Sequence, residues 1–133
     1  MKPECIPVDV GSRVSPRAFS AVRYSMRASE RGALDLHVDL VLDDASEASL
    51  VFGGPVGFRV LDERDLIEFW NSYSRPNGWL WEVLGGGWLE LESSREGFVD
   101  RELIPNLREF LVVGDMCVSV LCTRPPVLAA RGI

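Results

Sequence analysis

The amino-acid sequence predicts an α+β domain: a bent, mostly antiparallel sheet of six to eight strands with one main helix packed on it. Three observations lead to this class. Several runs alternate apolar and polar residues, as half-buried strands do. A single stretch, residues 63–74, carries apolar residues at clear helical spacing. Strand and helix patterns do not alternate along the chain, which argues against a parallel sheet of the Rossmann type.

The length and composition indicate one globular domain spanning residues 1–133. With 133 residues, of which 47% are hydrophobic and 26% charged, the chain can bury a core of its own. Residues 1–16 hold three of the eight prolines and predict an extended lead-in. Residues 125–133 predict an irregular tail.

The first half of the chain predicts strands separated by turns. Residues 19–27 favour a strand because they contain Val and Tyr. Residues 34–42, LDLHVDLVL, alternate strictly, so five aliphatic side chains should share one face. After a polar loop at 43–47, residues 48–61 predict two short strands, or one bent strand, with a break at Gly53-Gly54-Pro55.

Residues 63–74 predict the main helix. Asp62 suits the N-cap position, and acidic residues in the first turn favour the helix dipole. The apolar residues expected to face the core recur at helical spacing: Leu66, Ile67, Trp70 and Tyr73.

Residues 79–93, WLWEVLGGGWLELES, contain two alternating runs on either side of three glycines. This pattern predicts a β-hairpin with its loop at residues 85–87. In that register Glu82, Glu90 and Glu92 share one face with Trp88. The row is either a solvated sheet face or a surface that a cationic partner covers. The indole among the carboxylates favours binding, because aromatic residues are enriched at interface hot spots.

Residues 107–122 predict a closing hairpin with a two-residue type II′ turn at Gly114-Asp115. Both faces of its strands are mostly apolar, so we expect central strands covered on both sides. Between the two hairpins, residues 94–106 predict irregular structure with a helical turn at 101–104.

The polar residues of the LDLHVDLVL stretch form a candidate site. Asp35, His37 and Asp39 alternate along one strand, so they should share a face. This face is either the wet side of a sheet, which we favour, or the site of a small metal-dependent enzyme. His37 is the single histidine of the chain, and transition-metal sites usually need three or four ligands. We therefore predict no catalytic residue, no metal and no cofactor.

The charge balance indicates the class of partner. The formal net charge is −6, with 14 basic and 20 acidic residues, and Lys2 is the single lysine. Nucleic acid as the main ligand requires clustered basic residues, so we exclude it. An acidic surface suits a basic protein partner instead, although acidity also serves solubility. The predicted partner-binding residues are those of the glutamate row and the polar loop: Glu82, Trp88, Glu90, Glu92, Asp43 and Asp44.

The remaining signals predict a cytoplasmic protein with no membrane partner. The three cysteines are odd in number and none lies in a CxxC motif, so a secreted disulfide framework is not expected. The N-terminus lacks the apolar core of a signal peptide. No apolar run is long enough to span a bilayer.

Three stretches together resemble a known class of bacterial proteins: FRVLDERDLIEFW, GWLWEVLGGGWLELE and LREFLVVGDMCVSVLC. Over residues 48–122 the chain resembles the small immunity proteins of polymorphic toxin and contact-dependent growth inhibition systems. This resemblance implies a compact cytoplasmic inhibitor without catalytic residues, which neutralises a cognate toxin domain, frequently a nuclease. Two alternatives stay open: the metal-dependent enzyme that uses Asp35, His37 and Asp39, and a structural subunit of a homo-oligomer. For the oligomeric state we expect a monomer or a homodimer, and a homodimer would be joined through exposed strand edges.

Overall fold

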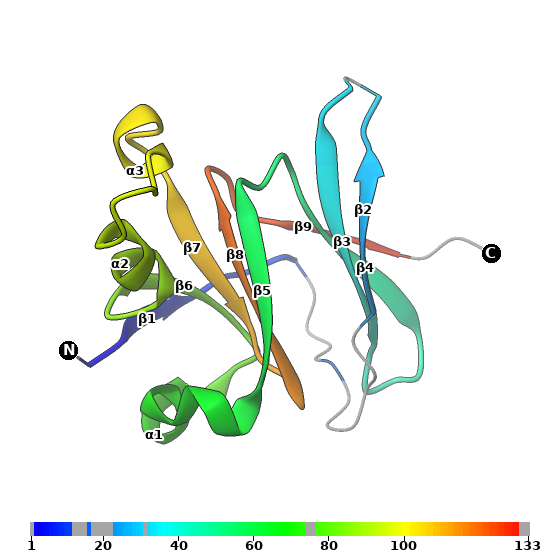
Figure 1. Cartoon of the computed structure of the whole chain (residues 1–133). Helices are drawn as coiled ribbons and strands as arrows, with labels where there is room; N and C mark the ends of the chain where they lie inside the picture. Colours follow the sequence, from blue (N-terminus) through cyan, green and yellow to red (C-terminus); the bar gives the residue numbers. More distant parts are fainter. Residues whose placement is uncertain (1, 12–15, 17–22, 31, 74–76, 131–133) are drawn as a thin grey trace.

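The computed structural model describes residues 2–11, 16, 23–30, 32–73 and 77–130. In this part of the chain, nine strands form two sheets, and every strand pairing is antiparallel. Figure 1 shows the two sheets side by side, with the short helices gathered on the far side of one of them. The mostly antiparallel character is therefore confirmed, whereas the single bent sheet is replaced by two.

The first sheet has five strands in the order β1-β6-β7-β8-β5. Their bounds are Glu4–Pro7 for β1, Gly57–Asp62 for β5, Leu80–Gly85 for β6, Arg108–Val112 for β7 and Met116–Cys122 for β8. The second sheet has four strands in the order β2-β3-β4-β9. Their bounds are Arg23–Ala28 for β2, Leu34–Val41 for β3, Glu47–Phe52 for β4 and Val127–Ala130 for β9.

The main core lies between the two sheets. It contains the inward residues of β3, β4, β7 and β8, among them Leu36, Leu50 and Phe110. Leu36 and Val38 have no exposed surface, so the aliphatic side of LDLHVDLVL builds the core as predicted. The predicted break after β4 is also confirmed, because residues 53–56 carry the chain from one sheet to the other.

Short helices cover the opposite face of the first sheet. They are the 3-10 helix η1 (Glu63–Phe69) and the α-helices α1 (Trp70–Tyr73), α2 (Trp88–Ser93) and α3 (Asp100–Leu103). Leu66 and Phe69 of η1 pack on Trp81 and Leu111 of the sheet. Leu89 of α2 packs in a separate small cluster with Leu107 and Leu121. The molecule thus has three layers: helices, the five-stranded sheet and the four-stranded sheet.

The main helix begins where predicted but differs in type. Asp62 is the N-cap and its carboxylate accepts a hydrogen bond from the Arg64 N–H. The segment then forms a 3-10 helix with a kink at Leu66 before the single turn of α1. Because side chains three apart share a face in a 3-10 helix, Leu66 and Phe69 are buried together. Ile67 and Trp70, predicted to face the core, are exposed instead.

The hairpin predicted at residues 79–93 is wrong. The first half forms β6, but Trp88–Ser93 forms α2, and the partners of β6 are β1 and β7. Leu and Glu are good helix formers, so the sequence WLELES is compatible with a helix as well as with a strand. In the folded chain the Glu109 carboxylate accepts a hydrogen bond from the Leu89 N–H at the start of α2, and this tertiary contact favours the helix.

The two terminal segments are more ordered than predicted. The lead-in contains β1, which pairs with β6 at the edge of the first sheet. The predicted irregular tail contains β9, which pairs with β4, and Leu128 packs against the main core. Both are edge strands of four residues. So short a strand contains too few residues to show a clear alternation of apolar and polar side chains in the sequence.

Three further predictions concern the strand at residues 19–27, the closing hairpin and the helical turn at residues 101–104. The part of the strand predicted at 19–27 that the structure describes belongs to β2, while residues 19–22 lie outside the described residues. The closing hairpin exists and is buried on both faces, as predicted. Its register is shifted, because Val112 pairs with Val118, so the connection is longer than the predicted two-residue turn. The helical turn predicted at 101–104 corresponds to α3.

Over the described ranges, no helix is long and apolar enough to cross a membrane.

Candidate functional site

The predicted glutamate row is separated by the fold. Glu82 pairs with Phe110 across β6 and β7, so it lies on the face of the first sheet that is opposite to α2. Its carboxylate accepts two hydrogen bonds from Arg108, at 2.8 and 2.7 Å. This bidentate pair occupies both oxygens of Glu82 and raises the pKa of Arg108. Glu82 therefore does not share a surface with Glu90 and Glu92.

Trp88 and Glu92 remain together on α2, one helical turn apart. The Trp88 indole N–H donates to Glu92 at 3.2 Å, and Arg95 donates to the same carboxylate at 2.5 Å. The guanidinium of Arg59 lies 5.3 Å from the centre of the Trp88 ring, a cation–π contact. These contacts fix the indole between α2 and β5, where it is partly buried.

Glu90 faces the other side of α2 and is exposed. Its carboxylate accepts a hydrogen bond from the Gly86 N–H, which belongs to the turn before the helix. Asp43 and Asp44 lie in the turn between β3 and β4 of the second sheet, at lower right in Figure 1. Asp44 caps that turn by accepting from the Ser46 N–H. Two members of the predicted set therefore belong to a different part of the molecule from α2.

The strongest candidate is the surface formed by residues 88–104, which we call the α2–α3 surface. It carries five carboxylates and two arginines, a formal charge of −3 out of −6 for the whole chain. Three apolar side chains stand exposed among these charges: Leu91 by 66%, Val99 by 57% and Leu103 by 71%. Exposed apolar residues within a charged rim are typical of protein interfaces.

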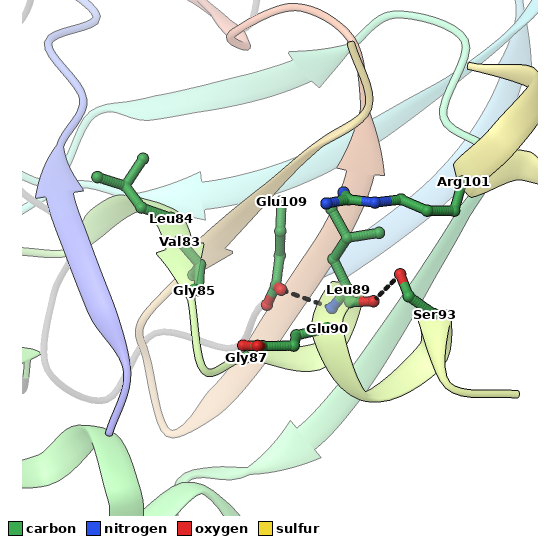
Figure 2. Close-up of a pocket in the computed structure, with 9 residues that line it drawn as sticks. All are labelled: Val83, Leu84, Gly85, Gly87, Leu89, Glu90, Ser93, Arg101 and Glu109. Carbon is green, nitrogen blue, oxygen red and sulfur yellow. Dashed lines mark hydrogen bonds between the residues drawn. The ribbon is translucent and has the colours of Figure 1, made fainter. Parts of the chain in front are cut away.

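Two hollows flank α2. One has a volume of about 250 Å³ and lies between Trp88, Glu92, Val99 and Asp100. The other has a volume of about 170 Å³, and Figure 2 shows the nine residues that line it. Its charged members are Glu90, Arg101 and Glu109. The surface is therefore concave on both sides of the helix.

Glu109 is the buried member of this site. It lies on β7 with 1% of its surface exposed, and one carboxylate oxygen accepts from the Leu89 N–H at 2.7 Å. The other oxygen, Oε2, has no hydrogen-bond partner among the described residues. Burial raises the pKa of the Glu109 carboxyl, although N–H groups of Leu89 and Trp88 and the charge of Arg59 act against this.

Gly87 leaves room for this carboxylate. A methyl group on Gly87 would meet Val83 at 2.6 Å and the two Glu109 oxygens at 2.8 and 3.0 Å. A glycine is therefore required at the start of α2 for steric reasons, with no need for an unusual backbone angle. Gly87, the last of the three consecutive glycines at 85–87, is therefore the N-cap of a helix that covers a buried acid.

Sequence reasoning missed Glu109. The one available signal was an acidic residue inside LREFLVV, a run otherwise predicted to be covered on both faces. An acid at such a position is buried unless the strand is an edge, and buried acids are concentrated at functional sites.

The second candidate, the row on β3, is only partly open to solvent. Asp39 is 8% exposed and accepts a hydrogen bond from Ser49 at 2.6 Å, with Arg27 at 4.0 Å. Asp35 accepts from the Gly54 N–H at 3.2 Å. A shallow hollow of about 620 Å³ is lined by Asp35, His37 and Arg124 but not by Asp39. Within the described ranges, no three His, Cys, Asp or Glu side chains are grouped to hold a metal ion.

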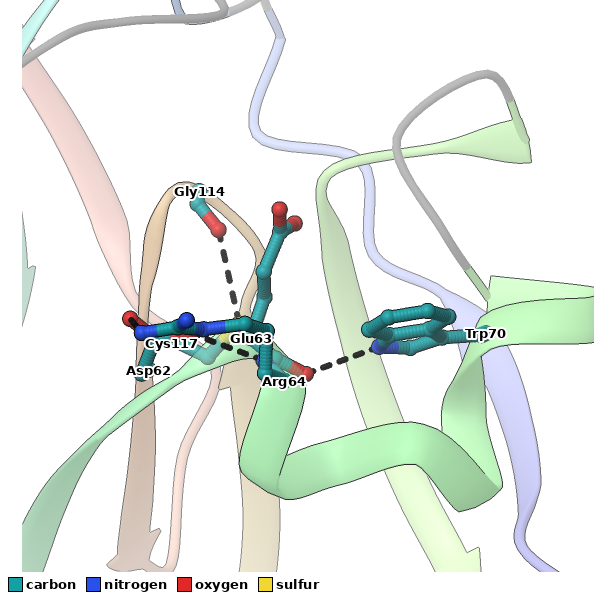
Figure 3. A network of polar contacts seen from close by, with 6 residues as sticks. All are labelled: Asp62, Glu63, Arg64, Trp70, Gly114 and Cys117. Carbon is teal, nitrogen blue, oxygen red and sulfur yellow. Dashed lines mark hydrogen bonds and ion pairs between the residues drawn. The ribbon is translucent and has the colours of Figure 1, made fainter.

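A third acidic surface surrounds η1. Figure 3 shows Trp70 donating its indole N–H to the Glu63 carbonyl, at 2.7 Å, beside the Asp62–Arg64 ion pair. Trp70 is 43% exposed, so the tryptophan predicted for the core lies on the surface. Residues of η1 line none of the three hollows described above, which distinguishes this surface from the α2–α3 surface.

Comparisons with protein-family models, curated proteins and solved structures give no match for this chain.

Proposed function

We propose that this protein is a non-catalytic binding protein that neutralises a cognate toxin domain by binding it through the α2–α3 surface. The observation that carries the proposal is that residues 88–104 combine a formal charge of −3, three exposed apolar side chains and several residues that line two hollows. An enzyme at Asp35 and His37 is supported less well, because Asp39 is already engaged by Ser49.

The electrostatics favour a basic partner. A domain that cleaves nucleic acid needs a positive cleft to hold phosphate, so an inhibitor that covers the cleft gains from carboxylates. Opposite potentials also accelerate association, which matters when a toxin must be bound before it acts. The exposed Leu91, Val99 and Leu103 then supply apolar contact area for such a partner.

Growth protection tests this proposal. A candidate toxin domain, sought among the genes that neighbour the one encoding this protein, is expressed in bacteria alone and together with this protein. We expect growth arrest in the first case and rescue in the second, because the bound toxin is inactive. The triple variant Glu90→Lys, Glu96→Lys and Glu102→Lys should fail to rescue, since it replaces negative charge on the α2–α3 surface by positive charge.

The matched control reverses three exposed carboxylates on η1, with Glu63→Lys, Asp65→Lys and Glu68→Lys. It changes the net charge by the same amount and should still rescue growth. Rescue by the α2–α3 variant would contradict the proposed surface. Failure of the unaltered protein to rescue growth would contradict the proposed function.

A further inference from the structure

The hollow beside α2 contains an acceptor that the fold leaves unsatisfied. Glu109 Oε2 is buried and has no hydrogen-bond partner among the described residues. Buried polar atoms are almost always paired, because leaving one without a partner costs free energy. Glu109 is one of the residues that line the hollow, so its buried carboxylate lies next to space that a donor from outside can enter.

The charges around the hollow select a cation. Two carboxylates, Glu90 and Glu109, and one guanidinium, that of Arg101 on α3, line the hollow. The charge of Arg59 also acts on Glu109, although Arg59 does not line the hollow. Arg101 is exposed, so a competing cation can displace it into solvent at little cost. The deepest charged group is Glu109, and it is the one that lacks a partner on Oε2.

The walls of the hollow fit a long, flexible side chain. Val83, Leu84 and Leu89 provide apolar surface along the way to Glu109. Lysine and arginine bury the methylene groups of their side chains against apolar surface while the charged end reaches a polar partner. A volume of about 170 Å³ suits one such side chain and excludes a folded segment.

We propose that this hollow takes one lysine or arginine side chain of the partner protein, whose cation donates a hydrogen bond to Glu109 Oε2. The inference rests on the proposed function and deepens it, because it names the group of the partner that the α2–α3 surface recognises. Bound in this way, the basic side chain satisfies a buried acceptor, which is the arrangement expected of an interface hot spot.

The test uses capped amino acids as probes, so it does not depend on the toxin. N-acetylarginine amide and N-acetyllysine amide are titrated into the labelled protein, and N-acetylcitrulline amide serves as the uncharged control. The readout is the backbone amide signal of Leu89, whose N–H donates to Glu109. We expect saturable shifts with the two cations and none with citrulline.

Two variants locate the site. Glu109→Gln keeps the shape and should weaken cation binding by about tenfold or more, since a charge-assisted hydrogen bond is lost. Arg101→Gln is an exposed change that should tighten cation binding, because it removes the competing guanidinium. Glu96→Gln removes one surface charge away from the lining residues and should leave binding within about twofold.

Equal shifts with arginine and citrulline, unchanged binding in Glu109→Gln, or weaker binding in Arg101→Gln would each overturn the inference. If Glu109→Gln does not fold, the citrulline comparison and Arg101→Gln still decide. Toxin neutralisation without cation binding would reject this inference and leave the proposed function intact. Cation binding without toxin neutralisation would reject the proposed function and leave the cation site intact.

Discussion

At the scale of single residues, Glu109 does the most to define the site. It anchors the start of α2 through the Leu89 N–H, yet one of its oxygens stays without a partner among the described residues. A buried carboxylate in this state destabilises the isolated protein, because the charged form has lost its hydration. The cost is compatible with a group kept for binding, and it produces a measurable dependence of stability on pH.

That dependence has a definite sign. Burial raises the pKa of Glu109 above its ordinary value of 4.5, so between these two pKa values the folded state holds a proton that the unfolded state releases. The free energy of unfolding therefore falls as the pH rises through the folded-state pKa. The side chain at position 109 no longer titrates in Glu109→Gln. The free energy of unfolding of this variant, minus that of the unaltered protein, should therefore increase from pH 4 to pH 8.

Denaturant unfolding at several pH values measures this difference. The exposed Glu96→Gln serves as the control, and its relative stability should change much less over the same range. A constant difference for Glu109→Gln, or one that shrinks as the pH rises, would show that burial does not raise the pKa of the Glu109 carboxyl.

At the scale of elements, the sequence predicts strands with two-residue periodicity better than it predicts their partners. The runs of β3, β4, β7 and β8 were recognised because each buries at least one regular face. The sequence pattern does not predict the short edge strands β1 and β9, because they form by backbone pairing with β6 and β4 and show little alternation of side chains.

The error at residues 88–93 has a different cause. WLELES alternates like a strand, and its Leu and Glu also favour a helix. One contact that favours the helix comes from Glu109, which is 20 residues away from Leu89 in the sequence. The candidate site was therefore only partly predictable: Trp88, Glu90 and Glu92 belong to it, whereas Glu82, Asp43 and Asp44 belong to other surfaces.

Gly87 provides a test at this scale. Gly87→Ala should lower the free energy of unfolding by about 1–3 kcal/mol, because the added methyl group collides with Val83 and Glu109. In Gly97→Ala the added methyl group meets only the end of the flexible Arg95 side chain, so a change within about 0.5 kcal/mol is expected. Equilibrium unfolding of both variants gives the comparison, and equal stability would mean that α2 does not pack closely on Glu109.

At the scale of the whole molecule, the proposed binding surface and the main core belong to different layers. The second sheet and the inner face of the first form the main core, while the other face of the first sheet carries the helices. Half of the formal charge of the chain lies within residues 88–104 of that helical layer. This arrangement presents an acidic, concave surface on a rigid sheet, as expected of a preformed binding protein.

The central claim is that the α2–α3 surface binds a basic partner protein. The most direct measurement is the dissociation constant for the toxin domain, determined by titration calorimetry for the unaltered protein and for the two triple charge reversals. We expect reversal at Glu90, Glu96 and Glu102 to weaken binding by about a hundredfold or more, and reversal at Glu63, Asp65 and Glu68 to change it by less than about fivefold. Equal losses for the two triple variants, or undiminished affinity after reversal on the α2–α3 surface, would contradict this claim.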